Sequence, residues 1–334
     1  MDTVRLTVGQ AIVRFMARQY VERDGREQRF IAGVWGIFGH GNVAGFGQAL
    51  EELGDAEEMP YFRPQNEQAQ VHLAAAFARH NNRLRTYACT SSVGPGSMNM
   101  ITGAAGATVN RIPVLLLPSD YFANRTPDPV LQQIEHPTER DASANDAFRP
   151  VSRFFDRISR PEQLLGSLPE AFRILTDPAD TGAVTISLPE DVQSEAFDWP
   201  ERFFDRRVWR VRRPLPEPAD VAQAARLIAA ATAPLIVVGG GAIYSEATEE
   251  LSTFATRDEG PMNRDPHARH SETPRQRLCC ISGSILPGCS SCRVDVCAAG
   301  ATRVSHDGTP AASSTPWRVR LRPTGTIRGA VEYT

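Results

Sequence analysis

The chain has 334 residues, a formal net charge of −3, 41% hydrophobic residues and 22% charged residues. This length suggests two domains, and the nearly balanced charge gives no electrostatic reason to expect nucleic acid or an anionic membrane as a partner. No apolar run reaches the ~20 residues needed to cross a bilayer, and the N-terminus lacks the pattern of a secretion signal, so a cytoplasmic protein is expected.

The beginning of the chain predicts helices around one buried strand. Apolar residues recur at helical spacing from Thr3 to Glu22, which predicts an amphipathic helix. The apolar run 30–38 (FIAGVWGIF) has the length of a buried strand that feeds a glycine-containing loop. Residues 44–53 are expected to be helical, and residues 59–62 to be a short extended piece.

The stretch from 63 to 108 carries the most information. Glu67 opens a helix-like run with an apolar face, which is formed by Val71, Ala74, Ala75 and Ala78. A β-like segment, 86–90, then leads into a glycine-rich turn, and the small-residue run 103–107 would let a second helix pack closely. A carboxylate at a helix start, facing a glycine-rich strand end, is typical of ligand sites in open α/β sheets, although small residues also serve plain packing.

The next part of the chain continues the alternation of strands and helices. Buried strands are predicted over 112–117 and 182–188, with a helix over 161–175 between them. Residues 121–149 are polar and contain proline, and a loop of that length in a compact domain is usually functional or disordered. The alternation predicts a mostly parallel sheet covered on both faces.

The sequence loses its periodicity near residue 194 and partly regains it near residue 219. Residues 194–218 contain several prolines and an arginine cluster, which favours a solvated linker between domains. A helix over 219–233, a strand over 234–238 and a helix from Ser245 follow. Between them, Gly239-Gly240-Gly241 lacks the spacing of a dinucleotide-binding loop.

Two motifs resemble the pyrimidine-binding domain of thiamine diphosphate enzymes. They are Asn66-Glu67 with its downstream Ala-Ala-Phe-Ala-Arg, and residues 90–99 (TSSVGPGSMN), similar to the helix-borne glutamate and S-x-G-P-G-x-x-N turn of those enzymes. Three further segments resemble the trihydroxycyclohexane-dione hydrolases of myo-inositol breakdown, namely 36–43 (GIFGHGNV), 103–111 (GAAGATVNR) and 127–133 (PDPVLQQ). The resemblance runs from about Met1 to Leu251.

The resemblance implies an α/β fold with a doubly wound parallel sheet. Residues 1–200 are expected to form the pyrimidine-binding domain, followed by a linker over 201–218. Residues 219–255 would be the start of an incomplete second α/β domain, the central domain of the family, and 256–334 an irregular, disordered tail.

The resemblance also assigns the site. Glu67 would be the catalytic carboxylate that binds the ring nitrogen of the pyrimidine, although a helix start also favours a glutamate for electrostatic reasons alone. The remaining cofactor-binding candidates lie at two strand ends: Gly39, His40, Gly41, Gly94, Pro95, Gly96 and Asn99. A tight turn or an incidental loop histidine would explain several of them without a ligand. Three others could line a substrate pocket: Asp120, Glu135 and His136.

The function implied by the resemblance is thiamine diphosphate-dependent hydrolytic opening of a C–C bond in 3D-(3,5/4)-trihydroxycyclohexane-1,2-dione, giving 5-deoxy-glucuronate. In the family the site is shared between subunits of a homodimer or a dimer of dimers, and Mg²⁺ holds the diphosphate. The family's G-D-G magnesium motif is not found in this sequence, so an inactive fragment, at most a dimerisation partner, is one alternative. Another thiamine diphosphate enzyme, such as a decarboxylase or an acetolactate synthase-like protein, is a second, but residues 113–133 favour the hydrolase.

The sequence changes character after about Leu251. Residues 257–334 are rich in Arg, Pro, Ser, Gly, Thr and Cys and have little periodicity, which suggests an out-of-frame translation beginning between 251 and 260. Cysteines and histidines there could be assembled into a zinc site, with Cys289-x-x-Cys292 and His267-x-x-His270 as the nearest to a pattern. They lack the paired, regular spacing of zinc modules, so no metal site is expected.

Overall fold

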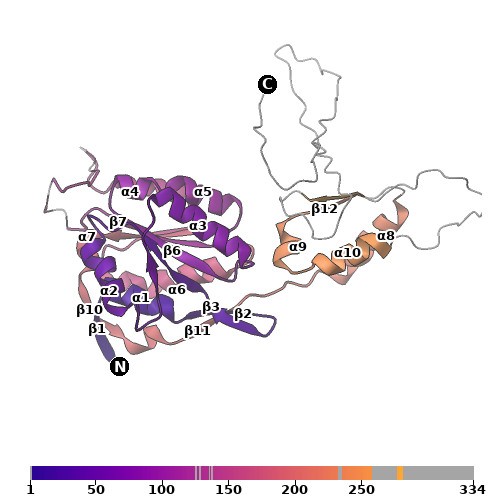
Figure 1. The fold of residues 1–334 in the computed structure, drawn as a ribbon, viewed down its shortest axis with the longest axis horizontal. Helices are drawn as coiled ribbons and strands as arrows, with labels where there is room; N and C mark the ends of the chain where they lie inside the picture. The colour runs from indigo at the N-terminus through magenta and orange to yellow at the C-terminus, as the bar shows by residue number, and fades with distance from the viewer. Residues whose placement is uncertain are drawn as a thin grey trace, which may run out of the picture. The chain divides into compact units, whose positions relative to one another are not determined.

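The computed structural model describes residues 2–124, 126–127, 129–134, 136, 138–231, 235–257 and 277–280 (Figure 1). The chain divides into two compact units, Met1–Pro214 and Leu215–Thr334, and each unit is described here by itself. The first unit contains all the candidate site residues. It extends 14 residues beyond the expected boundary at residue 200.

A six-stranded sheet forms the centre of the first unit. All neighbouring strands in this sheet are parallel. Their order is β5 (Tyr61–Phe62), β4 (Ile31–Gly36), β6 (Thr86–Ser91), β7 (Val114–Asp120), β9 (Ala183–Pro189) and β8 (Phe154–Arg157). Every residue of β7 and β9 is buried, as is usual for the central strands of a parallel sheet. The predicted α/β class is therefore confirmed.

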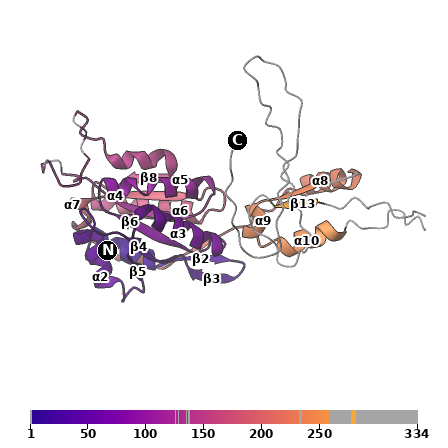
Figure 2. The ribbon, with the colours of Figure 1, turned by 45° about the horizontal axis from the view of Figure 1, so that its top comes forward.

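Helices cover both faces of this sheet. α1 (Val8–Ala17) and α6 (Leu164–Thr176) bury their apolar faces in one core with the side chains of β4, β7 and β9. α3 (Glu67–His80) and α5 (Ile101–Val109) lie on the opposite face (Figures 1 and 2). The shorter helices are α2 (Gln48–Leu53), α4 (Pro95–Met98), α7 (Glu190–Gln193), a π-helix (Val43–Gly47) and 3-10 helices at Ala144–Val151, Pro161–Gln163 and Glu201–Phe204. The sheet is doubly wound, as predicted.

The small-residue run on α5 has the packing role expected of it. A Cβ built on Gly103 would lie 2.6 Å from Cβ of Val71 on α3, so a larger residue there would force the two helices apart. This close approach fixes α3, and hence Glu67 at its start, against the turn that precedes α5.

The predicted helix from Thr3 to Glu22 is wrong at both ends. Residues Thr3–Thr7 form β1, and residues Gln19–Arg23 form β2. Thr7 ends the strand by capping α1, because its side chain accepts a hydrogen bond from the Gln10 N–H while the Gln10 side chain accepts one from the Thr7 N–H. β1 pairs antiparallel with β10 (Ala196–Pro200), a partner too distant in sequence for local periodicity to reveal.

Much of the segment expected to be a linker is folded into the first unit. After β10, residues Arg207–Arg210 form β11, which pairs with β2, and β2 pairs with β3 (Arg26–Arg29) in a three-stranded sheet. Trp199, Phe203 and Phe204 are buried in the core. Three arginines of this segment form ion pairs: Arg206 with Glu27, Arg210 with Glu22 at 3.0 Å, and Arg213 with Asp24 at 2.6 Å.

The loop 121–143 has no helix or strand among its described residues, as predicted. The irregular segment does not reach Arg149, because Ala144–Val151 forms a 3-10 helix that Ser143 caps. Strand β8, on the outer edge of the sheet, has only four residues and was not predicted.

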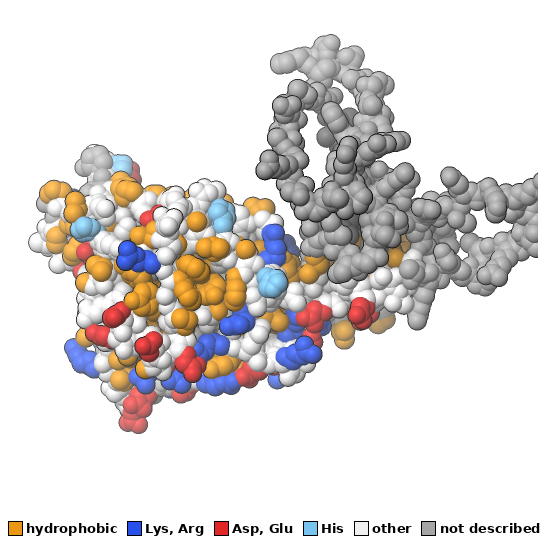
Figure 3. Space-filling view, in the orientation of Figure 1, with side chains coloured by type: hydrophobic (Ala, Val, Ile, Leu, Met, Phe, Trp, Pro, Cys, Tyr) orange, Lys and Arg blue, Asp and Glu red, His pale blue; other side chains and the backbone are white. Residues whose placement is uncertain are grey.

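Apolar side chains are exposed on the face that carries α3. Trp35 of β4 packs on Phe62 of β5 with ring centroids 4.9 Å apart, and Tyr87 of β6 packs on Phe77 of α3 at 4.5 Å. Phe62 and Leu73 remain 38% and 48% exposed. The space-filling view shows hydrophobic side chains gathered on this face (Figure 3).

The second unit has the predicted helix and strand and a later helix, but a short helix also covers most of the expected glycine turn. Its elements are α8 (Pro218–Ala230), β12 (Leu235–Val238), α9 (Gly240–Tyr244), α10 (Thr248–Arg257) and β13 (Arg277–Cys280). β12 and β13 are parallel. The hypotheses of an out-of-frame tail and of cysteine or histidine zinc ligands fall almost entirely outside the described residues. In the part of the chain that is described, no helix has the length and apolarity to cross a membrane.

Candidate active site

Loops from four neighbouring strands meet at the carboxyl ends of the sheet, and buried side chains tie them together. The amide of Gln193, after β9, donates to the carbonyls of Gly41 and Leu188, and its oxygen accepts from the Phe46 N–H at 3.2 Å. The hydroxyl of Ser97 donates to the carbonyls of Ser92, at 2.8 Å, and Ser119, at 2.9 Å.

Asn42 fixes the loop after β4 in the same way. Its amide donates to the Ile37 carbonyl at 3.1 Å and to Thr90 Oγ1 at 3.2 Å, and its oxygen accepts from the Gly39 N–H. Asn42, Ser97 and Gln193 were not predicted, because a single buried polar residue in a loop or in a four-residue helix has no periodic signal. Together their hydrogen bonds connect the loops at this edge of the sheet.

Glu67 lies in the first turn of α3, at this edge. Asn66 begins the helix, since its side chain accepts the Ala69 N–H at 3.0 Å. The helix dipole favours a carboxylate in this turn. Glu67 Oε2 accepts a hydrogen bond from Asn99 Nδ2 at 2.8 Å, and both side chains are partly buried. The predicted pairing of a helix-borne glutamate with the glycine-rich turn is therefore present.

The glycine turn brings its backbone against Glu67. Gly94 has a φ of +70°, which glycine adopts without strain, and a Cβ there would overlap the carbonyl of Gln132. Pro95 then starts α4 with its fixed φ. A Cβ on Gly96 would overlap the Ser92 hydroxyl and come within 3.2 Å of Glu67 Oε1. The absence of a side chain at Gly96 therefore lets the Ser92 hydroxyl and the Glu67 carboxylate lie close to the backbone of the turn.

This arrangement fits a planar nitrogen heterocycle. Asn99 holds Oε2 of Glu67, and Oε1 has no hydrogen-bond partner among the residues the structure describes. A carboxylate oxygen beside a turn that has no side chain at Gly96 can accept a hydrogen bond from a protonated ring nitrogen. The candidate binding site for such a ring therefore consists of Glu67, Gly96 and Asn99.

The loop after β4 reaches the same place through Ser92. A Cβ on Gly39 would lie 3.2 Å from Ser92 Cβ, and one on Gly41, whose φ is +96°, would lie 2.7 Å from Ser119 Cβ. The His40 carbonyl accepts the Val93 N–H at 2.9 Å, while its side chain is exposed. Gly39 and Gly41 therefore serve close packing of backbone at this edge, and no contact of the His40 side chain links it to Glu67 among the described residues.

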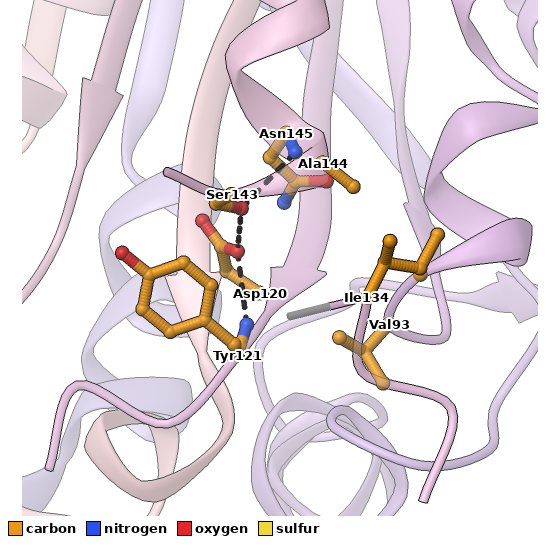
Figure 4. Close-up of a pocket in the computed structure, with 8 residues that line it drawn as sticks. Val93, Asp120, Tyr121, Ile134, Ser143, Ala144 and Asn145 are labelled. Atoms are coloured by element: carbon orange, nitrogen blue, oxygen red, sulfur yellow. Dashed lines mark hydrogen bonds between the residues drawn. The ribbon is translucent and has the colours of Figure 1, made fainter. Parts of the chain in front are cut away.

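Asp120 belongs to a separate buried network (Figure 4). It is 2% exposed and accepts hydrogen bonds from Ser143, Ser187, Arg157 and its neighbour Tyr121. The network borders a small hollow lined by Val93, Gly94, Asp120, Tyr121, Ile134, Ser143, Ala144 and Asn145. Since four protein donors already surround its carboxylate, Asp120 anchors both ends of the loop 121–143 rather than offering an oxygen to a substrate.

The two other predicted pocket residues lie in that loop. Glu135 falls outside the described residues. His136 is exposed, and its Nδ1 accepts the Glu139 N–H at 3.0 Å. Neither is brought to Glu67 by any contact that the structure describes.

Asp146 also belongs to the network around Asp120, because Arg157 donates a hydrogen bond to it, and its pKa is shifted. Burial pushes the pKa of Asp146 up, but hydrogen bonds from the Ser143 N–H and Arg149, together with the charge of Arg157 2.9 Å away, outweigh it and leave the pKa below its ordinary value. A carboxylate whose folded-state pKa is depressed stabilises the fold above its unfolded pKa of ~3.9 and loses that stabilisation as the pH falls through the folded value.

We expect the Asp146→Asn variant to lose less stability on acidification than the unmodified chain. The free energy of unfolding, measured by urea denaturation from pH 6 to pH 3, should fall less steeply below about pH 4 in the variant. Asp180→Asn, at an exposed loop position, is the control and should keep the original slope. If the free energy of unfolding fell equally steeply with pH in all three chains, the depressed pKa of Asp146 would be contradicted.

The comparison with known families agrees with this geometry. A family described as "Thiamine pyrophosphate enzyme, N-terminal TPP binding domain" matches residues 27–141, and one described as "Thiamine pyrophosphate enzyme, central domain" matches residues 221–281. The chain belongs to the thiamine pyrophosphate enzymes, whose cofactor is thiamine diphosphate. The central-domain match passes Leu251, where the resemblance was expected to end.

Similar proteins carry the name of one kind of enzyme within this family. The chain is 56% identical over 255 residues to 3D-(3,5/4)-trihydroxycyclohexane-1,2-dione hydrolase 1 of Bacillus cereus, an alignment that covers 76% of this chain and 39% of the relative. It is 55% identical over 257 residues to 3D-(3,5/4)-trihydroxycyclohexane-1,2-dione hydrolase of Geobacillus thermodenitrificans, covering 77% of this chain and 40% of that one. The chain thus spans about two fifths of the length of these relatives.

Proposed function

We propose that this chain supplies the pyrimidine-binding part of a thiamine diphosphate-dependent hydrolase that opens a C–C bond of 3D-(3,5/4)-trihydroxycyclohexane-1,2-dione. The observation that carries the proposal is the position of Glu67, with one oxygen held by Asn99 and the other facing the backbone of Gly96. The relatives named for this substrate support the choice of reaction.

Each residue of the site has a part in this proposal. Glu67 Oε1 would bind the ring nitrogen of the aminopyrimidine and hold or release a proton there. Asn99 would keep the carboxylate turned toward the ring, and Gly94, Pro95 and Gly96 would give the ring a surface to lie on. When bound, the cofactor supplies the carbanion chemistry that cleavage of the C–C bond requires.

Three further features belong to the proposal through the family resemblance. They are Mg²⁺ at the diphosphate, a second subunit that completes the site, and a cytoplasmic location. Apolar side chains exposed on the face that carries α3, such as Leu73, support a protein partner, since grouped apolar surface often marks an interface.

A titration of the chain with thiamine diphosphate tests the proposal. In isothermal calorimetry with Mg²⁺ present, we expect saturable binding to the unmodified chain and weaker binding to Glu67→Ala. Glu170→Ala, which changes an exposed glutamate on α6, should bind like the unmodified chain. Binding that does not depend on Glu67 would contradict the proposed site.

Gly96→Ala is expected to weaken cofactor binding about tenfold, because the new methyl group would displace the Ser92 hydroxyl and crowd Glu67 Oε1. Overpacking of this kind also costs a fold roughly 1–3 kcal/mol of stability, so the unfolding midpoint is measured beside the affinity. Calorimetric dissociation constants would measure the change. Gly106→Ala is the matched control, because nothing lies within 4 Å of a Cβ at that exposed helical position, and it should bind normally. Equal affinities for the two variants would show that no ring approaches Gly96.

A further inference from the structure

Ser92 lies where the two glycine-containing loops of the site meet. It follows β6, and its carbonyl is fixed by the hydroxyl of Ser97 at 2.8 Å. Its side chain packs between Gly39 on one side and Gly96 on the other, because a Cβ on either glycine would crowd it. The backbone therefore gives this side chain a defined position.

The hydroxyl of Ser92 differs from those of the neighbouring serines. Ser91 donates to Ser97 at 3.3 Å, Ser97 donates to two carbonyls, and Ser119 accepts from Gln193 at 3.4 Å. The Ser92 hydroxyl has no hydrogen-bond partner among the described residues, although its residue is partly buried. A hydroxyl in such a position gains a hydrogen bond when a polar ligand enters.

The Ser92 hydroxyl and Oε1 of Glu67 both lie against Gly96. The position that a Gly96 Cβ would take is next to the Ser92 hydroxyl and 3.2 Å from Glu67 Oε1. A carboxylate only accepts hydrogen bonds, whereas a hydroxyl both donates and accepts. The pair therefore suits an aromatic ring that carries both N–H groups and unprotonated nitrogens, which is the composition of an aminopyrimidine.

We propose that Ser92 is a further binding residue of the site and that its hydroxyl makes a hydrogen bond to the bound aminopyrimidine ring. This inference rests on the proposed function and adds to it a residue that the sequence did not single out. The side chain would have the same role whichever substrate the enzyme opens, because it would contact the cofactor and not the substrate.

Ser92→Ala tests the inference, since it removes the hydroxyl and keeps the Cβ that packs on Gly39. We expect thiamine diphosphate to bind the variant about 3- to 10-fold more weakly in calorimetry, the loss typical of one neutral hydrogen bond. In ¹H–¹⁵N spectra of the full chain, the Gly96 amide signal should move on addition of thiamine and move less in the variant. Ser159→Ala, at an exposed loop position, is the matched control and should behave like the unmodified chain.

The possible results distinguish the role of Ser92 from the proposed function of the chain. If the unmodified chain binds in a Glu67-dependent manner and Ser92→Ala binds equally well, the inference is wrong and the proposed function stands. If millimolar thiamine leaves the Gly96 signal of the unmodified chain in place, both are wrong. Weaker binding to Ser92→Ala with an unchanged midpoint of urea unfolding supports the inference, because a structural role for the hydroxyl would lower that midpoint.

Discussion

Under the proposed function, Glu67→Gln is expected to lower cofactor-dependent ring opening by about 10²- to 10⁴-fold, the range in which a positioned general acid or base contributes to catalysis. Glutamine has nearly the same shape as glutamate but does not exchange a proton with a ring nitrogen. Its amide oxygen can still accept the hydrogen bond that Asn99 donates to Oε2 at 2.8 Å. The variant therefore changes the chemistry of the site while keeping its packing.

The measurement is the steady-state rate of the assembled enzyme on 3D-(3,5/4)-trihydroxycyclohexane-1,2-dione at saturating cofactor. Glu170→Gln, at an exposed position on α6, is the control and should retain full activity. The unfolding midpoint of Glu67→Gln should stay close to that of the unmodified chain. A variant with more than a tenth of the original rate would exclude Glu67 as the proton-exchanging group.

Asp120→Ala is expected to destabilise the first unit by about 3–5 kcal/mol, because it removes the buried carboxylate of a largely buried ion pair and leaves Arg157 paired with the more exposed Asp146. Asp120 is 2% exposed, and the Arg157 side chain 2.7 Å from it is only 14% exposed. Removing the carboxylate also strands the hydroxyls of Ser143 and Ser187, which both donate to it.

Urea denaturation measures this loss, and limited proteolysis locates it. Because Ser143 ties the end of the loop 121–143 to Asp120, cleavage in that loop should become faster in the variant. Glu170→Ala is the control: it breaks the exposed pair with Arg173, whose side chains are 42% and 50% exposed, and should cost less than about 1 kcal/mol. If both variants lowered the free energy of unfolding by a similar amount, the buried network around Asp120 would not stabilise the fold as expected.

The elements that carry the candidate site could be predicted because their signals are local. Asn66 caps the helix that Glu67 begins, and Gly94 supplies a φ that other residues avoid, so both features can be recognised within a few residues of sequence. The parallel sheet was predictable for a similar reason. Its central strands are short apolar runs between helices, as in β7 and β9.

The features that were missed depend on partners far away in the chain. β1 pairs with β10 across some 190 residues, and β11 pairs with β2 across a similar distance, so neither run shows its partner locally. The same holds for single side chains. His40 attracts attention because it can titrate, whereas Ser92 looks ordinary until the fold places it between Gly39 and Gly96.

The pairing of β1 with β10 places Thr3 opposite Pro200, so two points almost the whole unit apart in sequence lie one strand spacing, about 4.8 Å, from each other. These two strands therefore close the unit on itself, because β11 and the buried Phe203 and Phe204 continue from β10 into the same unit. A deletion of Thr3–Thr7 would leave β10 without its partner strand, and it is expected to loosen both ends of the unit at once.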